Sequence, residues 1–279
     1  MSEQFVSLAS GSEIPVMGLG TWNLDGEEVR QSVRTALEEG YKHIDTAEGY
    51  GNEAIIGDVL QEFERGDIWL TTKVLPKNLN YESVLNSCKS SLEKLQTDYL
   101  DLFLIHWPNP AISLRETLEA MKKLYDEGYV KNVGVSNFSA YQLSCAHHIS
   151  EVPIVVNQIE YHPWYTQDSV VEYCRKTNTI VEAAAPLGRT AVFNDPVIQN
   201  ISEKVGQPRA VVALRWAINN GVVVLPKSSS AEHIINNRIA LDWNLSDSDQ
   251  LEIDSIQRNE PVYDFPSRDW ERPKYGIST

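Results

Sequence analysis

The chain alternates short apolar runs with longer segments of helical period, and this alternation occurs eight times. The apolar runs are rich in Val, Ile and Leu, whereas the segments between them repeat apolar residues every three or four positions. Strands buried on both faces have such continuous apolar sequences, and strands that alternate with helices form parallel sheets. We therefore expect parallel strands at residues 16–20, 42–46, 68–74, 100–107, 132–136, 154–159, 180–185 and 222–225.

Eight strand–helix units predict an α/β fold of the (β/α)8 TIM barrel type, in which functional residues gather at the C-terminal ends of the strands. The alternative is a doubly wound open sheet, which usually carries a glycine-rich turn after its first strand. Here Gly18-Leu19-Gly20 is followed by Thr21 and Trp22, without a third glycine. The sequence therefore favours the barrel.

The segments at the two ends of the chain do not belong to the repeating pattern. Residues 5–9 and 13–17 flank a Ser-Gly-Ser turn, which predicts an N-terminal β-hairpin that caps the barrel. From about Arg258 onward the chain is rich in proline and predicts a long irregular C-terminal tail. No linker is visible between these segments, so residues 1–279 are expected to form a single barrel domain.

The first two helical segments have recognisable boundaries. The first starts at Asp25, and Glu28 three residues later completes the sequence pattern of a capping box. Gly40 is expected to end this helix, because glycine adopts the left-handed backbone conformation found at helix C-termini. A second helix is expected over residues 53–63.

Charge and hydropathy limit the partners of this chain. It carries 24 Lys and Arg against 39 Asp and Glu, and the resulting net charge of −15 argues against nucleic acid or an anionic membrane as a partner. No apolar run approaches the roughly 20 residues that span a bilayer, and the first residues do not resemble a signal peptide. We expect an acidic, cytoplasmic monomer that acts on a small molecule.

Four ionisable side chains lie at the ends of three consecutive predicted strands. Asp45 and Tyr50 follow the second strand, Lys73 ends the third and His106 ends the fourth. Asp45 can pair with Lys73, whose cation then lies near Tyr50 and lowers the cost of forming a phenolate. A neutral His106 can orient a substrate carbonyl toward Tyr50. A proton donor without a nucleophile or metal cluster suits carbonyl chemistry in which a cofactor supplies the electrons.

A candidate phosphate site follows the eighth predicted strand. The segment Leu225-Pro-Lys-Ser-Ser-Ser230 leads into a helix, so that Lys227 and several hydroxyls lie near a helix N-terminus. Such a terminus binds anions through its free backbone N–H groups. An ordinary helix cap beside a solvated lysine explains the same residues, and the sequence leaves both interpretations open.

Seven motifs in order resemble those of the aldo-keto reductases, in particular the prokaryotic branch that includes diketogluconate reductases. They are Gly20-Thr-Trp22, Asp45-Thr-Ala-Glu-Gly-Tyr-Gly-Asn-Glu53, Thr72-Lys73, Leu104-Ile-His-Trp-Pro108, Gly134-Val-Ser-Asn-Phe138, Gln158-Ile-Glu-Tyr-His-Pro163 and Pro226-Lys-Ser228. The resemblance extends from the hairpin to the last helix. It implies a (β/α)8 barrel that reduces the carbonyl of an aldehyde or ketone to an alcohol with NADPH, using Asp45, Tyr50, Lys73 and His106 as catalytic residues.

The resemblance also implies which residues contact the cofactor and the substrate. The expected cofactor contacts are Gly20, Thr21, Trp22, Ser136, Asn137, Gln158, Pro186, Leu187, Lys227, Ser228, His233 and Asn237. The expected substrate pocket consists of Trp22, Tyr50, His106 and Trp107, with Phe265 and Trp270 of the tail added to its wall. No metal ligand is expected.

Two positions depart from the family pattern. Ala184 stands where family members usually carry an aromatic ring that stacks on the nicotinamide. His233 replaces the arginine that clamps the adenosine 2′-phosphate, and Asn236 replaces a neighbouring glutamate. Because a bidentate arginine binds phosphate more strongly than a neutral imidazole, use of NADH in place of NADPH stays open. We expect NADPH binding to tighten when His233 is protonated.

Two other functions remain as alternatives. His43 and Asp45 lie two residues apart on a predicted strand and point the same way, so they could begin the metal site of a hydrolase on the same barrel. A barrel that binds the cofactor without turnover is the second alternative, because a fold does not determine a function.

Overall fold

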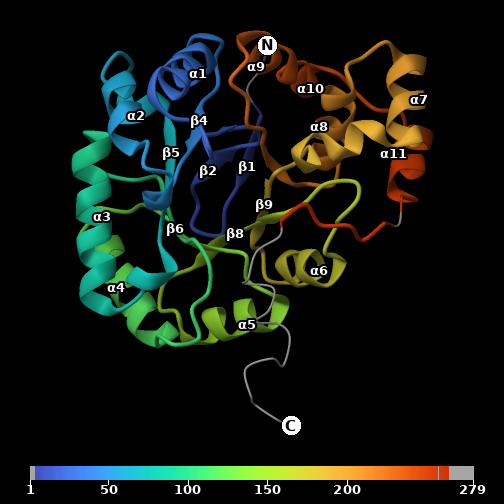
Figure 1. Cartoon of the computed structure of the whole chain (residues 1–279). Coiled ribbons are helices and arrows are strands. Elements are labelled where there is room, and N and C mark those ends of the chain that lie inside the picture. Colours follow the sequence, from blue (N-terminus) through green and yellow to red (C-terminus); the bar gives the residue numbers. More distant parts are fainter. Residues whose placement is uncertain (1–3, 257, 264–279) are drawn as a thin grey trace.

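A computed structural model describes residues 4–256 and 258–263 of the chain (Figure 1). Its centre is an eight-stranded sheet in which every neighbouring pair is parallel, in the order β10-β9-β8-β7-β6-β5-β4-β3. The strands are β3 (Leu19–Gly20), β4 (His43–Asp45), β5 (Trp69–Val74), β6 (Leu102–Ile105), β7 (Val133–Ser136), β8 (Ile154–Glu160), β9 (Ile180–Ala184) and β10 (Val223–Leu225). All eight predicted strands are present, with somewhat different ends.

The last strand bonds back to the segment around the first, which closes the sheet. Val224 donates its backbone N–H to the carbonyl of Val16 and accepts the N–H of Gly18, both over 2.9 Å. Gly20 donates to the carbonyl of Pro226 over 3.1 Å. The predicted (β/α)8 barrel is therefore confirmed, and the alternative of an open doubly wound sheet is wrong.

Helices surround the barrel on its outside (Figure 1). In chain order they are α1 (Gly26–Glu38), α2 (Glu53–Leu60), α3 (Tyr81–Leu95), α4 (Leu114–Asp126), α5 (Ala140–Ile149), α6 (Asp168–Lys176), α7 (Pro196–Val205), α8 (Arg209–Asn219), α9 (Ala231–Asn237), α10 (Ile239–Asp242) and α11 (Asp247–Asp254). Short 3-10 segments are η1 (Glu48–Tyr50), η2 (Arg65–Asp67), η3 (Pro76–Asn78) and η4 (Gly188–Asn194). Within the described residues, no helix has the length and apolar character needed to cross a bilayer.

The N-terminus of α1 differs from the sequence expectation. The Asp25 side chain makes no capping hydrogen bond, so the predicted capping box with Glu28 is wrong. The backbone of Gly26 has a φ of +48°, and this left-handed first residue turns the chain before the helix proper begins. A capping box does form at α5, where the Ser139 hydroxyl accepts the N–H of Gln142 and the Gln142 side chain accepts the N–H of Ser139.

Helix α2 ends at Leu60, three residues before the predicted end. Glu62 and Phe63 donate their N–H groups to the carbonyls of Val59 and Leu60, so each bond spans three residues. Such bonds tighten the last turn out of α-helical geometry. The apolar pattern continues through this turn, which explains why the sequence suggested a longer helix.

The N-terminal hairpin closes the end of the barrel where the strands begin, as predicted. Strands β1 (Phe5–Ser7) and β2 (Glu13–Pro15) pair antiparallel, with Val6 opposite Ile14. Leu8 and Ile14 pack in one buried apolar cluster with Trp69, Leu102, Leu104, Val155, Val156 and Val223 of the barrel strands. This cluster fills the barrel at its N-terminal end, which leaves the C-terminal end for polar side chains.

Only the beginning of the expected C-terminal tail is described. Residues 258–263 contain no helix or strand. Phe265 and Trp270, which were expected in the pocket wall, lie outside the described residues.

Candidate active site

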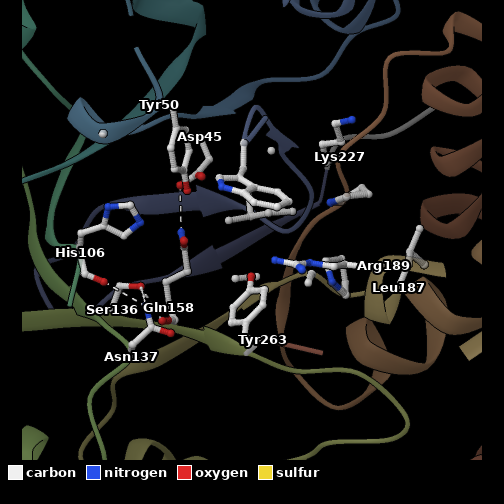
Figure 2. Close-up of a pocket in the computed structure, with 18 of the residues that line it drawn as sticks. Asp45, Tyr50, His106, Ser136, Asn137, Gln158, Leu187, Arg189, Lys227 and Tyr263 are labelled. Atoms are coloured by element: carbon white, nitrogen blue, oxygen red, sulfur yellow. Dashed lines mark hydrogen bonds between the residues drawn. The ribbon is translucent and has the colours of Figure 1, made fainter. Parts of the chain in front are cut away.

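The four expected catalytic side chains meet at the C-terminal end of the barrel. Asp45 is the last residue of β4, Tyr50 ends η1, Lys73 lies near the end of β5 and His106 directly follows β6. Because neighbouring parallel strands end at the same edge, their terminal side chains are brought together. In Figure 2, Asp45, Tyr50 and His106 converge on one cavity.

Lys73 is the centre of this group. Its side chain is fully buried, and its Nζ donates to Asp45 Oδ1 over 2.6 Å and to the carbonyl of Thr46 over 2.8 Å. Nζ lies 3.4 Å from the Tyr50 Oη. A buried cation and carboxylate in such contact offset part of the cost of burying each charge.

The environment of Tyr50 keeps its hydroxyl protonated. Burial raises the pKa of Tyr50 well above its usual value, and the Asp45 carboxylate raises it further. Lys73 Nζ lies within reach of the Tyr50 hydroxyl, so its expected role in easing formation of a phenolate stays a prediction. Tyr50 is therefore a protonated phenol at neutral pH, which is the form that can donate a proton.

His106 is held neutral beside Tyr50. Burial and, after it, the nearby Lys73 cation together lower the pKa of His106 to about 3. The two rings are arranged edge to face, with centroids 5.5 Å apart. A neutral imidazole beside a protonated phenol offers two uncharged hydrogen-bonding groups to the same substrate atom.

Amide and hydroxyl groups form the opposite wall of the cavity (Figure 2). Ser136 Oγ donates to the carbonyl of Gln158 over 2.8 Å, and Asn137 Nδ2 donates to Ser136 Oγ over 2.9 Å and to the carbonyl of His106 over 3.0 Å. Asn137 has a φ of +62°, a conformation that asparagine tolerates better than most residues. Gln158 Nε2 donates to Asp45 Oδ2 over 2.9 Å, which joins this wall to the catalytic group.

A single cavity of about 860 Å³ contains most of the expected site. The predicted residues that line it are Gly20, Trp22, Asp45, Tyr50, His106, Trp107, Ser136, Asn137, Gln158, Pro186, Leu187, Lys227, Ser228 and His233. Ala184, the position without the expected ring, also lines it. The sequence thus identified about half of the residues that line this cavity.

Two expected cofactor contacts do not line the cavity. Thr21 is fully buried, and its hydroxyl donates to the carbonyl of Asp45 over 2.9 Å, so it supports the wall from behind. Asn237 is buried at the end of α9. Motif position alone could not distinguish a lining residue from a buried one.

The loop after β10 could bind an anion through its charged side chains more than through its serine hydroxyls. Ser228 Oγ accepts the N–H of Ser230, and Ser230 Oγ accepts the N–H of His233 at the start of α9. These hydroxyls therefore serve local turns and caps, which is the plainer of the two sequence interpretations. Lys227 and His233 are exposed on the cavity and remain the groups that can meet an anion.

The chain matches the Aldo/keto reductase family over residues 16–258. It belongs to this family. A glyoxal reductase of Bacillus subtilis is 38% identical over 260 residues, with 92% of this chain and 94% of the relative covered. An NADP-dependent D-sorbitol-6-phosphate dehydrogenase of Malus domestica is 34% identical over 304 residues, with 95% and 97% covered.

A solved structure supports the same assignment. An aldo-keto reductase from Bombyx mori, crystallised in complex with NADP, superposes with a TM-score of 0.90 at 30% identity, covering 98% of both chains. Family membership implies an oxidoreductase that reduces carbonyl groups with a nicotinamide cofactor. The match to a bacterial relative is consistent with the expected prokaryotic branch.

Arg189 is a cavity residue of this aldo/keto reductase that the sequence did not reveal. Its guanidinium lies 4.6 Å from the Trp22 ring centre and 5.2 Å from that of Tyr263. Arg189 and Thr190 have φ values of +49° and +72°, so two successive non-glycine residues adopt left-handed conformations. No motif marks this position, and only its place directly after the Pro-Leu-Gly segment could have drawn attention to it.

Tyr263 is a second such residue, and Glu160 places it in this reductase. The Glu160 carboxylate accepts the backbone N–H groups of Val262 and Tyr263, and His162 Nε2 lies 2.9 Å from Glu160 Oε1. Glu160 therefore fastens the end of the described chain to the last residue of β8. This contact joins residues more than 100 positions apart, which no local pattern predicts.

His43, the possible first ligand of a metal site, has a different environment. It is fully buried, its Nε2 lies 3.0 Å from Thr71 Oγ1, and burial lowers its pKa to about 3. Gly18 leaves room for its ring, because a Cβ there would approach His43 within 2.8 Å. Among residues 4–256 and 258–263, no three His, Cys, Asp or Glu side chains are grouped to hold a metal ion.

Proposed function

We propose that this chain is an NAD(P)H-dependent carbonyl reductase in which Tyr50 is the general acid. The observation that carries the proposal is the position of Tyr50 Oη, 3.4 Å from a buried Lys73 Nζ and beside the neutral His106, in a cavity large enough for a dinucleotide. The substrate class is small aldehydes and ketones, which are reduced to alcohols. We place the enzyme in the cytoplasm as a monomer.

The cavity walls fit a nicotinamide cofactor. Gln158 and Asn137 line the cavity with side-chain amides and Ser136 with a hydroxyl, which are groups that can hydrogen-bond a carboxamide. Lys227 and His233 supply the basic groups that a 2′-phosphate needs. When bound, the reduced nicotinamide supplies a hydride to the carbonyl carbon.

The chain's own residues account for the other half of the reaction. His106 orients the carbonyl oxygen by a hydrogen bond, and Tyr50 donates its phenolic proton to that oxygen as negative charge develops. Lys73, held by Asp45, then stands next to the phenolate and stabilises it. Because the pKa of Tyr50 lies above its usual value in the resting site, the phenol is protonated before each turnover.

NADPH is the proposed cofactor, with NADH as a weaker alternative. Lys227 faces the cavity, whereas the arginine expected at position 233 is replaced by histidine. One structural neighbour was crystallised in complex with NADP and one relative is NADP-dependent, which supports the same choice. Dissociation constants for both cofactors between pH 5.5 and 8 would test this preference, and equal affinities throughout would contradict it.

The Tyr50→Phe variant tests the acid. It should bind NADPH with unchanged affinity, yet turn over an aldehyde about 100- to 10,000-fold more slowly, since that is the usual contribution of general acid catalysis. Oxidation of NADPH is followed by absorbance with a panel of aldehydes, ketoses and diketo acids, including glyoxal. Tyr141→Phe is a matched control, because Tyr141 is 79% exposed on α5.

Two results would contradict the proposal. If Tyr50→Phe reduces an activated aldehyde at the unaltered rate, Tyr50 is not the acid. If the unaltered protein binds NADPH but reduces no member of the panel, the alternative of a cofactor-binding barrel without turnover gains support.

A further inference from the structure

Glu182 is a carboxylic acid buried inside the barrel that the reaction outlined above does not use. It lies in the middle of β9, directly opposite Gln158 of β8, and its side chain is fully buried. Gln158 Nε2 donates to Glu182 Oε2 over 2.9 Å. Burying a carboxyl group costs free energy of folding unless hydrogen bonds compensate for the lost water. The hydrogen bond to Gln158 is therefore the contact from which a role for Glu182 can be inferred.

The contacts of Gln158 determine which way its amide faces. Nε2 carries two hydrogens, and each is donated to a carboxyl oxygen, one on Asp45 and one on Glu182, both over 2.9 Å. The reversed amide would place its oxygen against the Asp45 carboxylate, which is paired with Lys73 and can only accept, so the chemistry selects this orientation. The Gln158 Oε1 then has no hydrogen-bond partner among the described residues, and Gln158 lines the cavity.

The groups around Glu182 leave its carboxyl oxygen Oε2 free to accept the hydrogen bond from Gln158. Its Oε1 makes no hydrogen bond in the described part of the chain, and the nearest basic group, His43 Nε2, lies 3.8 Å away. Burial and, after it, the Asp45 carboxylate together raise the pKa of Glu182 to about 8. A proton on Oε1 leaves Oε2 to accept the Gln158 hydrogen, so the contact is present on both sides of that pKa.

We propose that Glu182 is a positioning residue which, together with Asp45, holds Gln158 with its Oε1 toward the cavity and thereby selects the amino group of the nicotinamide carboxamide. This inference rests on the proposed function, because it concerns the cofactor of that reaction. Glu182 touches neither cofactor nor substrate and acts through Gln158. Without the Glu182 contact, the Gln158 side chain can turn, and the amino group loses a fixed acceptor.

The experiment compares NADPH with its 3-acetylpyridine analogue, in which a methyl group replaces the carboxamide amino group. Dissociation constants are measured by quenching of tryptophan fluorescence, so the readout does not depend on turnover. The unaltered protein should bind NADPH more tightly than the analogue, on the order of 10-fold, because the analogue leaves Gln158 Oε1 unpaired. Glu182→Met should reduce this ratio about 3- to 10-fold by weakening NADPH binding alone.

Three further variants separate positioning from a general structural effect. Glu182→Gln keeps an acceptor oxygen at the same place and should retain the ratio. Glu182→Ala removes the acceptor by truncation instead of by an apolar chain, and should behave like Glu182→Met, so the test does not depend on one variant folding. Gln158→Met should abolish the ratio, and adding Glu182→Met to it should change nothing more.

The proposal is overturned if Glu182→Met and Glu182→Ala weaken NADPH and the analogue equally, since that is the result of a purely structural role. It is also overturned if the ratio is unchanged, or if Glu182→Met still lowers it in the Gln158→Met background. Absence of NADPH binding to the unaltered protein would instead overturn the proposed function, and this inference with it.

Discussion

Replacing Lys73 by methionine should be strongly destabilising, because it removes one half of a buried ion pair. Lys73 Nζ lies 2.6 Å from Asp45 Oδ1, and both side chains are almost completely buried. At an effective dielectric constant of about 20, two unit charges at this distance attract with roughly 6 kcal/mol. Among the described residues, the Asp45 carboxylate without Lys73 keeps only the hydrogen bond from Gln158. Loss of one partner of such a pair typically costs about 3–5 kcal/mol in free energy of unfolding.

The coupling between the two charges is measured with a double-mutant cycle. Asp45→Asn should cost a similar amount, because it leaves the Lys73 cation with two uncharged partners, the carbonyl of Thr46 and the Tyr50 hydroxyl. The variant that carries both changes has no uncompensated charge, so it should be about 2–3 kcal/mol more stable than the sum of the single effects predicts. Urea unfolding followed by circular dichroism gives these values. For a chain of this size, 3–5 kcal/mol corresponds to a fall in melting temperature of about 6–10 °C.

An exposed pair with the same geometry provides the control. Lys176 Nζ also lies 2.6 Å from the carboxylate of Glu172, but these side chains are 69% and 67% exposed. Solvent screens such a pair, so Lys176→Met and Glu172→Gln should leave the melting temperature unchanged within error. If the effects of Lys73→Met and Asp45→Asn are simply additive, the ion pair does not couple as argued, and its proposed influence on Tyr50 fails with it.

Three further predictions concern the cofactor, the pH dependence of stability and helix packing. His233→Arg should tighten NADPH binding about 10-fold without affecting NADH binding, since a guanidinium can bind phosphate through two hydrogen bonds. If the variant binds NADPH no more tightly, or tightens NADH binding instead, the 2′-phosphate does not lie beside residue 233. The pKa of His43 is about 3 in the folded protein, against an ordinary value of 6.5. Between these two pH values the folded state binds fewer protons than the unfolded state, so stability falls as pH decreases. Between pH 6.5 and 5 this group should cost about 2 kcal/mol, and His43→Gln should remove that part of the loss in urea unfolding. Gly57→Ala should destabilise by about 1–3 kcal/mol, because a Cβ on α2 would overlap the Lys94 carbonyl of α3, whereas Gly66→Ala, with nothing within 4 Å, should be neutral in the same measurement.

Much of the site could be predicted because its residues follow strand ends. Asp45, Lys73 and His106 belong to three successive strands, and the strand–helix alternation fixes which end of each strand faces the site. Once a closed parallel barrel is accepted, residues at those ends must approach one another. The family resemblance then supplied roles that the residue pattern alone left open.

The local details that failed depended on backbone conformation. Asp25 has the sequence of a helix cap, but its side chain makes no capping hydrogen bond, and the next residue, Gly26, has a left-handed backbone. Thr21 belongs to a cofactor motif, yet its hydroxyl is used inside the wall. A sequence pattern states which groups are available, whereas the backbone determines where each group points.

The sequence by itself determined the (β/α)8 barrel, its hairpin cap and the set of strand-end residues, because alternation of apolar runs and helical stripes is a local property of the chain. Only the tertiary structure decided the protonation of Tyr50, the contact of Glu182 with Gln158, and the position of Arg189 beside Trp22. Each of these depends on burial and on contacts between residues far apart in the chain. Burial and charge act over all neighbours at once, and those neighbours are known only when the chain has folded.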